Sequence, residues 1–366
     1  MRSRVRGYLS QFWLGFTELS RTAFLTMVVA VVLTASAMLW FFSPSTLSGS
    51  EGDYAARSAY DAEAFVTLEA MRLAAKKQDR PRLLLFGSST LAQSLGDPRA
   101  LEDLLGNKFG AGDWDVHMLA APLQTRLDQL TLIQTILANR KADDPPVVIA
   151  IGIGAHRLGF YTPRLIELEQ TGRLGIRSDW ADGELAELGA QPRGRSRFYV
   201  FENLQFVVNH MPTTFLRFIL RSPAERRIAA YAPGQELPVV YRPRDITRAQ
   251  IENGRYGLEL YARFMMRLHD RLEAMPNVHL IFVDERLSPD FLANSGLLGM
   301  ADLLNSLFAT RVEGFGAPFI EMMKETDLSP ADYYDDYHIK NGEPQRRVRE
   351  SFAKDFVAYI QRISLG

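Results

Sequence analysis

Five short apolar runs alternate with helix-like stretches along most of this 366-residue chain. The runs cover residues 82–86, 115–121, 146–153, 278–283 and 317–322. The helix-like stretches, which carry apolar residues at helical spacing, cover 91–105, 127–139, 246–275, 300–310 and 344–363. Strands that alternate with helices in this way form a parallel sheet with helices on both faces. The sequence therefore predicts a doubly wound α/β fold.

Two segments fall outside this alternation. Residues 43–80 contain a polar linker and then a lead-in helix over 53–77, ahead of the predicted α/β domain at 81–366. Residues 156–244 separate the third apolar run from the next long helix, and we interpret them as a mostly helical insertion in that domain. Ligand chemistry in such sheets lies at the carboxyl ends of the strands, so the residues directly after each run are the ones to inspect.

The amino-terminal part of the chain has the pattern of a membrane anchor. Residues 22–42 contain no charged side chain, and at about 1.5 Å per residue this run is long enough to cross a hydrocarbon core of about 30 Å. Four arginines and one acid precede it, and three aromatic residues end it: Arg2, Arg4, Arg6 and Arg21, then Glu18, and Trp40, Phe41 and Phe42. The positive-inside rule places residues 1–21 in the cytoplasm. We therefore expect a single-pass protein of the inner (cytoplasmic) membrane with its catalytic domain in the periplasm or outside the cell.

A cleaved signal peptide is the alternative interpretation of this segment. Ala35, Ser36 and Ala37 have the small-x-small form of a cleavage site. The apolar run continues beyond them to Phe42, which favours a retained helix. Under either interpretation the body of the protein is exported.

Composition excludes several classes of protein. The 42 basic and 43 acidic residues give a net charge of −1, whereas a protein that coats duplex DNA needs a surplus of positive charge. The chain has no cysteine, which excludes a thiolate nucleophile, an iron–sulfur cluster and a cysteine zinc site. We also find no metal-site spacing of His, Asp and Glu and no glycine-rich phosphate loop. We therefore expect no metal, no cofactor and no nucleic-acid partner.

A short polar motif follows the first apolar run directly: Gly87, Ser88, Ser89 and Thr90. Glycine allows a sharp turn, and the start of the next helix offers free backbone N–H groups. A serine hydroxyl at this point would stand at the carboxyl edge of the sheet beside backbone donors, which is what acyl transfer requires. An ordinary helix cap is the alternative interpretation.

A second motif, Asp335 and His338, lies just before the last predicted helix. This spacing brings a carboxylate to one imidazole nitrogen and leaves the other nitrogen for a hydroxyl group. Alone, the pair is an unremarkable feature of a protein surface. Its position joins it to the serine motif, because both reach the same edge of a doubly wound sheet.

Together the two motifs resemble those of the SGNH/GDSL hydrolases, over residues 82–363 without the insertion. The resemblance implies a flavodoxin-like, SGNH-type sheet. It also implies that Ser89 is the nucleophile, His338 the general base and Asp335 the residue that orients the base.

The chain departs from the family at the third block, where the family has Gly-x-Asn-Asp. Gly152 matches the glycine, but Gly154 stands where the family has an asparagine that donates to the oxyanion. The candidate oxyanion donors implied by the resemblance are Ser89, Ala121, Gly152 and Gly154. His156 and Arg157 lie close by in the sequence as candidate donors or substrate-binding residues. An ordinary loop residue is the alternative interpretation of His156.

The predicted architecture also resembles that of the D-alanyl transfer proteins of lipoteichoic acid synthesis and the alginate O-acetylation proteins. The shared features are an anchor, an exported hydrolase-like domain and an incomplete third block. This resemblance implies an acylated glycan or acyl donor as substrate and a membrane-bound O-acyltransferase as partner. One hypothesis is therefore an esterase or O-acyltransferase that acts on acyl, above all acetyl, esters of an envelope polymer or exopolysaccharide through an acyl-Ser89 intermediate. The other is a weak or inactive accessory protein that binds the acyltransferase or the polysaccharide. The sequence does not decide between hydrolase and transferase.

Overall fold

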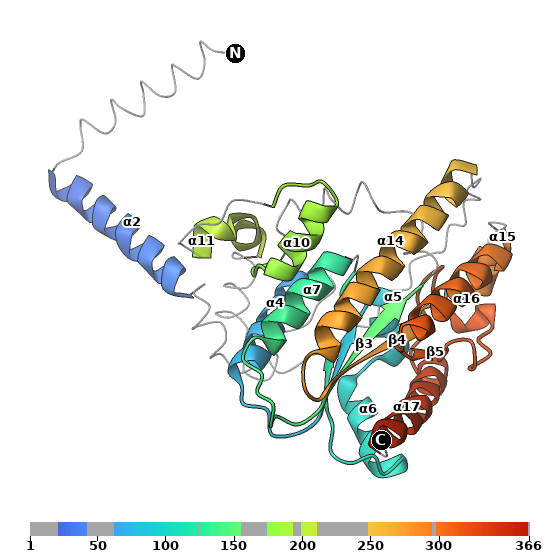
Figure 1. Ribbon diagram of the computed structural model, residues 1–366. Helices are drawn as coiled ribbons and strands as arrows, with labels where there is room; N and C mark the ends of the chain where they lie inside the picture. Colours follow the sequence, from blue (N-terminus) through green and yellow to red (C-terminus); the bar gives the residue numbers. More distant parts are fainter. Residues whose placement is uncertain are drawn as a thin grey trace.

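The computed structural model describes residues 21–41, 62–122, 124–154, 174–192, 199–210, 248–294 and 298–364. Its centre is a five-stranded sheet of order β2-β1-β3-β4-β5, in which all neighbouring strands are parallel (Figure 1). The strands are β1 (Arg82–Phe86), β2 (Asp115–Met118), β3 (Val147–Ile153), β4 (Val278–Asp284) and β5 (Phe319–Ile320). The expected α/β fold with a parallel sheet is confirmed.

The strand order identifies the edge of the sheet at which a ligand site is expected. From β1 the chain moves outward to β2, and it then returns to the other side of β1 to form β3. This reversal is a topological switch point, and such sheets bind ligands in the crevice outside the carboxyl ends of the strands there. A site of this kind is therefore expected beside the residues that follow β1 and β3.

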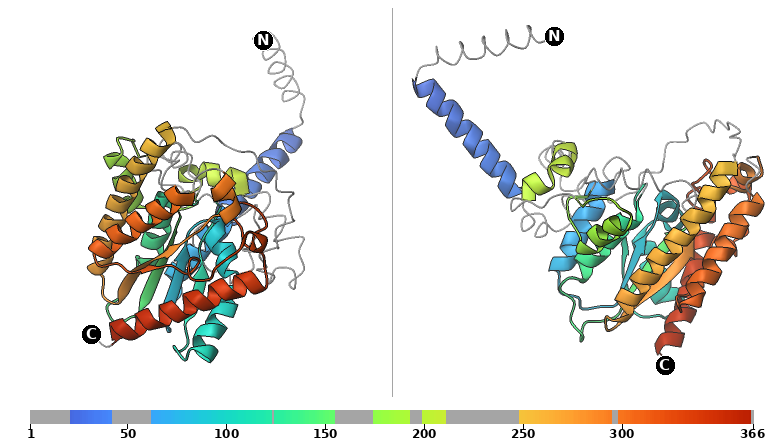
Figure 2. Two further views of the ribbon diagram at one scale, coloured as in Figure 1. Left: turned by 90° about the vertical axis from the view of Figure 1, so that its right-hand side faces the viewer. Right: turned by 45° about the horizontal axis from the view of Figure 1, so that its top comes forward.

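Helices cover both faces of the sheet (Figures 1 and 2). The first face packs against α4 (Ala62–Ala75), α7 (Arg126–Leu137), α10 (Asp179–Glu187), α14 (Arg248–Glu273) and α16 (Leu298–Gly314). The second face packs against α5 (Ser89–Leu95), α6 (Pro98–Asp103) and α17 (Glu343–Ser364). Alternate residues of a strand point to opposite faces, so Leu84 and Phe86 enter the first core and Leu83 and Leu85 the second. Each strand is apolar throughout because both of its faces are covered.

The helix expected over residues 91–105 is not continuous, and this prediction was wrong. α5 ends at Gly96, whose φ of +67° is left-handed, and Asp97 then caps α6 with Pro98 in its first turn. A π-helical turn, Leu104–Lys108, follows α6. The structure also contains two short helices, α11 (Tyr199–Glu202) and α15 (Pro289–Asn294), and a 3₁₀ turn, Pro330–Asp332.

The described part of the insertion packs on the first helical layer. Ala181 and Leu185 of α10 belong to the core of that layer. Glu184, which is buried, pairs with Arg267 and Arg271 of α14. α4 also belongs to the same core, so it is part of the packed domain although it precedes residue 81. The rest of the expected insertion, like residues 42–61, lies outside the described residues.

The amino-terminal helix α2 (Arg21–Phe41) extends away from the sheet (Figure 2). Its described side chains are largely exposed, among them Leu25 at 61% and Trp40 at 69%. Counted over the described residues alone, no helix reaches the length and apolar character of a membrane span.

Candidate active site

Ser89 lies where the sequence places it, on the turn from β1 into α5. It is the first residue of α5, and its side chain is partly exposed. Ser88 is the N-cap of this helix, and its Oγ accepts a hydrogen bond of 3.0 Å from the Thr90 amide. Gly87 makes the turn between strand and cap, and its N–H donates to Gln124 Oε1 at 2.9 Å. The capping residue is therefore Ser88, and the hydroxyl of Ser89 remains available for other contacts.

His338 and Asp335 lie in a closed loop between β5 and α17. Tyr333 and Ile339 form an antiparallel bridge across the base of the loop, and the Tyr334 amide donates to the His338 carbonyl at 2.8 Å. These backbone contacts hold the loop in one conformation, so the two side chains that it carries have defined positions.

The structure brings together the three residues that the sequence nominated. His338 Nε2 lies 2.9 Å from Ser89 Oγ, and His338 Nδ1 lies 2.7 Å from Asp335 Oδ2. Ser89 and His338 are 249 positions apart in the sequence, so the fold alone creates this contact. A hydroxyl bound to an imidazole that is in turn bound to a carboxylate is the arrangement that activates a serine nucleophile.

Asp335 has the electrostatic state that this arrangement needs. Burial of the carboxyl group opposes ionisation, but hydrogen bonds from the His338 ring and from the amides of Tyr337 and His338 outweigh it and hold the pKa of Asp335 below its usual value. Asp335 is therefore a carboxylate at neutral pH. It favours the histidine tautomer with hydrogen on Nδ1, which leaves Nε2 free to accept the serine proton.

The candidate oxyanion donors differ in whether their N–H groups are already hydrogen-bonded within the protein. The Ser89 N–H has no acceptor among the described residues, so it remains a candidate. The Ala121 N–H donates to the Gly87 carbonyl at 3.1 Å and is not a free donor, which corrects the expectation for this residue. Gly154 is buried directly after β3 and has no side chain to donate. His156 and Arg157 lie outside the described residues.

Gly152 lies inside β3, in register with Val283 of β4. A Cβ at this position would overlap the Oε1 atom of Glu285 and would lie 3.0 Å from its Cδ and 3.1 Å from its Cγ. The space beside Gly152 is thus filled by the Glu285 side chain.

Glu285 is a residue of the site that the sequence analysis missed. It follows β4 directly, its exposed fraction is 1%, and its carboxylate accepts hydrogen bonds from the Ser88 N–H at 2.9 Å and the Ser88 hydroxyl at 2.5 Å. A signal was present, because the residues after each strand are the expected ones and an acidic pair, Asp284 and Glu285, occupies this place.

A small cavity of about 180 Å³ adjoins Glu285. Leu287, Leu292, Leu328 and Tyr333 supply apolar walls, and Asn305 supplies a buried amide. Neither Ser89 nor His338 lines this cavity. It borders the carboxylate that holds the serine turn, on the side of β4 and α16.

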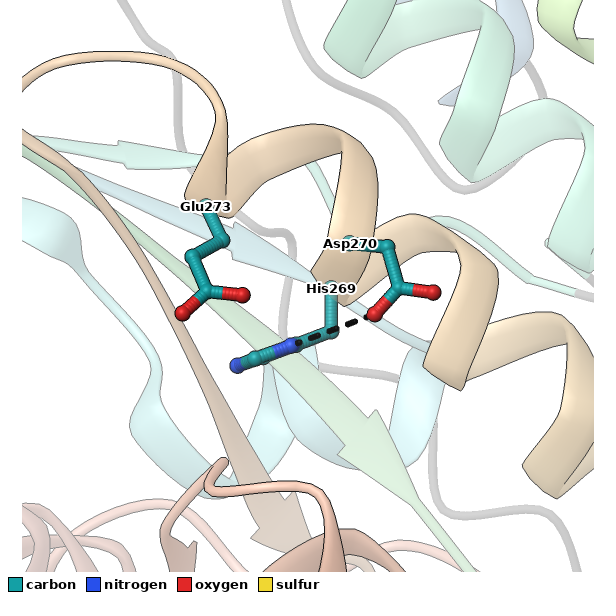
Figure 3. A group of neighbouring side chains, drawn as sticks. All are labelled: His269, Asp270 and Glu273. Carbon is teal, nitrogen blue, oxygen red and sulfur yellow. Dashed lines mark ion pairs between the residues drawn. The ribbon is translucent and has the colours of Figure 1, made fainter.

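One group of side chains within the described part of the chain has the spacing of metal ligands, contrary to the expectation from the sequence. His269, Asp270 and Glu273 of α14 each offer a ligand atom, and these atoms lie within 4.8 Å of one another (Figure 3). His269 Nδ1 is 3.9 Å from Asp270 Oδ1, and the His269 ring packs against Phe315. The group lies at the carboxyl end of α14, next to the start of β4 and not at the edge that carries the serine.

Comparisons with known proteins give only distant structural similarities. No family model and no curated protein matches the chain. Among solved structures, the chain is similar to an α/β hydrolase enzyme from the metagenome of Lake Arreo, with a TM-score of 0.39 and 11% identity over 77% of this chain and 98% of that one. It is also similar to a GDSL-like lipase from Bacteroides thetaiotaomicron, with a TM-score of 0.36 and 11% identity over 82% of this chain and 99% of that one.

Proposed function

We propose that this protein is a serine esterase or O-acyltransferase of the SGNH type. The observation that carries the proposal is the hydrogen-bonded chain from Ser89 Oγ through His338 to Asp335, with distances of 2.9 and 2.7 Å. Ser89 is partly exposed at the carboxyl edge of a parallel sheet, where substrates bind in folds of this kind.

In this proposal His338 Nε2 takes the proton of Ser89 as Oγ attacks the ester carbonyl. The carbonyl oxygen becomes an oxyanion, and the Asp335 carboxylate stabilises the imidazolium. The imidazolium then protonates the leaving alkoxide, which leaves an acyl-Ser89 ester. Water or a sugar hydroxyl attacks this ester as His338 removes its proton. The bond between the acyl group and Ser89 Oγ then breaks, and the imidazolium returns the proton to the serine oxygen. Water gives hydrolysis and a sugar hydroxyl gives transfer, and the same three residues serve both outcomes.

The proposed enzyme has few described donors for the oxyanion. The Ser89 N–H is available, but the Ala121 N–H is engaged with Gly87, and Gly154 offers no side-chain donor. Loss of one oxyanion donor costs about 10² to 10³ in rate. We therefore expect slow turnover by the isolated chain, or a site that a partner completes.

We further propose that the substrate is an acyl ester, above all an acetyl ester, of a cell-envelope polymer or exopolysaccharide. The support is topological: residues 22–42 form an uncharged run behind a cluster of arginines, and the described apolar side chains of α2 are largely exposed. A domain anchored on the outer side of the inner membrane takes its acyl groups from a membrane partner, such as an O-acyltransferase, or from esters already on a glycan.

Labelling with a fluorophosphonate tests the proposal. The full chain is purified in detergent, treated with the probe, and digested for mass spectrometry. We expect an adduct on Ser89 that is absent in Ser89→Ala and reduced at least 100-fold in His338→Ala, with unchanged thermal unfolding. A separate, unlabelled sample is then tested for acetate release from O-acetylated polysaccharide, which both the labelled protein and the Ser89→Ala protein should lack.

The engaged Ala121 amide also favours a second candidate function, a non-catalytic accessory protein that binds an acyltransferase or a polysaccharide. This candidate predicts no adduct on the folded chain, either purified or in native membranes. An adduct that forms only in native membranes would instead indicate an active site that a partner completes.

A further inference from the structure

We propose that Glu285 is a positioning residue for the Ser89 nucleophile, an inference that rests on the proposed function. The carboxylate lies at the end of β4, two strands away from β1, yet it contacts the turn that carries the serine. It does not touch the reacting atoms directly. It acts through Ser88, the neighbour of the nucleophile.

The contacts at Ser88 fix the turn at both its backbone and its side chain. Glu285 Oε1 accepts from the Ser88 N–H at 2.9 Å, and Oε2 accepts from the Ser88 hydroxyl at 2.5 Å. The same hydroxyl accepts from the Thr90 N–H at 3.0 Å. A hydroxyl has one donor and two lone pairs, so Ser88 Oγ transmits the constraint from the carboxylate to the first turn of α5. Ser89 lies between the two points that are held.

Two glycines make room for this carboxylate. A Cβ at position 87 would lie 2.5 Å from Glu285 Oε1, and a Cβ at position 152 would overlap the same atom. The chain thus lacks a side chain directly after β1 and within β3, at the two places that face the Glu285 carboxylate. The fold accommodates a fully buried carboxylate at this place, and its binding to two donors of Ser88 compensates part of the cost of burial.

A carboxylate suits this contact because both Ser88 groups that face Glu285 donate to it. Glutamine has nearly the same shape, but its NH₂ group can only donate, so the Ser88 hydroxyl would have to turn its hydrogen away and accept from that group. Glu285→Gln therefore keeps the packing, but it replaces the charge-assisted bond to the Ser88 hydroxyl by a neutral one and takes away the acceptor of the hydroxyl hydrogen. Since displacement of a reacting group by about 1 Å can cost about 10² in rate, we expect an effect on the nucleophile.

The neighbouring residue provides a matched control. Asp284 is fully buried, and its carboxylate binds the amides of Met323 and Lys324 and the side chain of Arg286. Asp284→Asn changes a buried carboxylate to an amide at the end of the same strand, but its partners are Arg286 and two amides that follow β5, and none of them lies on the serine turn.

The first experiment compares fluorophosphonate labelling rates of the full chain in detergent, below the unfolding temperature of each variant. We expect Glu285→Gln to lower the rate by about 10- to 100-fold, and Ser88→Ala, which loses the hydroxyl link alone, to lower it less. Asp284→Asn should label within about twofold of the wild type. A Glu285→Gln protein that labels at the wild-type rate, or no more slowly than Asp284→Asn, would overturn the proposal.

Chemical rescue separates positioning from mere stability. Glu285→Ala leaves a space between Gly87 and Gly152 that adjoins the cavity of about 180 Å³. Sodium formate supplies a small carboxylate that fits this space, so it should restore part of the labelling rate of Glu285→Ala, whereas sodium chloride should not. Equal effects of the two salts would contradict positioning by a carboxylate.

Hydrogen exchange distinguishes failure of this inference from failure of the proposed function. If the wild type is never labelled, the proposed enzyme fails, and exchange of the peptide that covers residues 87–91 decides the remaining question. Faster exchange in Glu285→Gln than in Asp284→Asn supports the positioning of the turn by Glu285. Equal exchange in the two variants overturns it.

Discussion

Gly152 illustrates how one missing side chain serves the site. It lies within a fully buried strand, where a β-branched residue would normally pack well. The structure fills the space beside it with the side chain of Glu285, whose Cδ and Cγ would lie 3.0 and 3.1 Å from a Cβ at this position. A methyl group would displace the whole side chain and not its tip alone. The glycine is therefore a condition for the bonds between Glu285 and Ser88.

We predict that Gly152→Ala lowers both stability and labelling of Ser89. Its Cβ would force Glu285 away from Ser88 and leave a buried carboxylate with fewer partners, which costs about 1–3 kcal/mol. The measurements are thermal unfolding and the fluorophosphonate rate. Gly183→Ala is the control, because a Cβ at Gly183 meets nothing within 4 Å and the residue lies in α10, where alanine stabilises by about 0.5–1 kcal/mol. Wild-type behaviour of Gly152→Ala would show that Glu285 can move at little cost.

The sequence was sufficient to nominate the three residues of the candidate triad, because position along the chain decides which edge of a doubly wound sheet a residue reaches. It was insufficient for Glu285 and for Ala121. The contact of Glu285 with Ser88 joins residues 197 positions apart, and no local pattern encodes it. The backbone donor at Ala121 is lost to a hydrogen bond with Gly87, which depends on how the loop after β2 closes.

At the scale of elements, a buried charged cluster joins α4 to β2. His117 of β2 lies 3.0 Å from Glu69 of α4 and 3.1 Å from Asp115 of its own strand. Arg72 of α4 pairs with Glu69, and Arg82 of β1 lies 3.7 Å from Asp115. Burial opposes the charge on His117, but its two carboxylates outweigh burial and raise its pKa. The cluster links a helix of the first layer to an edge strand of the sheet.

The pKa values of the two carboxylates, Glu69 and Asp115, shift in the opposite direction to that of His117. Burial raises the pKa of Glu69, but hydrogen bonds from His117 and Arg72 outweigh burial and lower the pKa to about 2. The hydrogen bond from His117 is the largest influence on Asp115 and holds its pKa at about 2 against burial. A lowered pKa means that the stabilisation is complete above the unfolded-state value of about 4.5 and is lost as the pH falls towards 2. For Glu69 alone this loss is about 3 kcal/mol.

We therefore predict a stability maximum at mildly acidic pH. The stabilisation from His117 is complete below pH 6.5 and is lost as the pH rises through its raised pKa. The stabilisation from the carboxylates is complete above about pH 4.5 and is lost as the pH falls below that value. Thermal midpoints measured from pH 3 to 9 should fall on the acidic and on the alkaline side of this maximum. His117→Gln should make the midpoint less dependent on pH on both sides. His279→Gln is the control: burial and Arg140 lower the pKa of His279, so its effect has the opposite sign. A flat wild-type profile would contradict this account.

The sequence predicted the strands correctly because burial on both faces makes them apolar throughout. The prediction failed over residues 91–105, where apolar spacing alone suggested one helix. Gly96 takes a left-handed conformation there, and Asp97 with Pro98 starts a new helix, so local backbone chemistry overrode the periodicity. Residues 289–294 were likewise too short for a periodic signal and form α15.

At the scale of the whole molecule, the proposed chemistry gathers at one edge of the sheet. Ser89 follows β1, Glu285 follows β4, and the loop with Asp335 and His338 precedes α17. β3 also ends at this edge, with Gly154 directly after it. The other edge, where the strands begin, carries none of the three triad residues.

Membrane anchoring by residues 22–42 is the proposal that concerns the molecule as a whole, and it predicts the fractionation of the chain. The full chain should sediment with membranes and resist extraction at alkaline pH, whereas a chain that begins at residue 49 should be recovered without detergent. In spheroplasts, added protease should remove a carboxyl-terminal tag and spare an amino-terminal one, because four arginines precede the run. A mature protein that starts at Met38 would instead establish cleavage after Ala37, and a carboxyl-terminal tag protected until lysis would place the serine in the cytoplasm and overturn the proposed substrate.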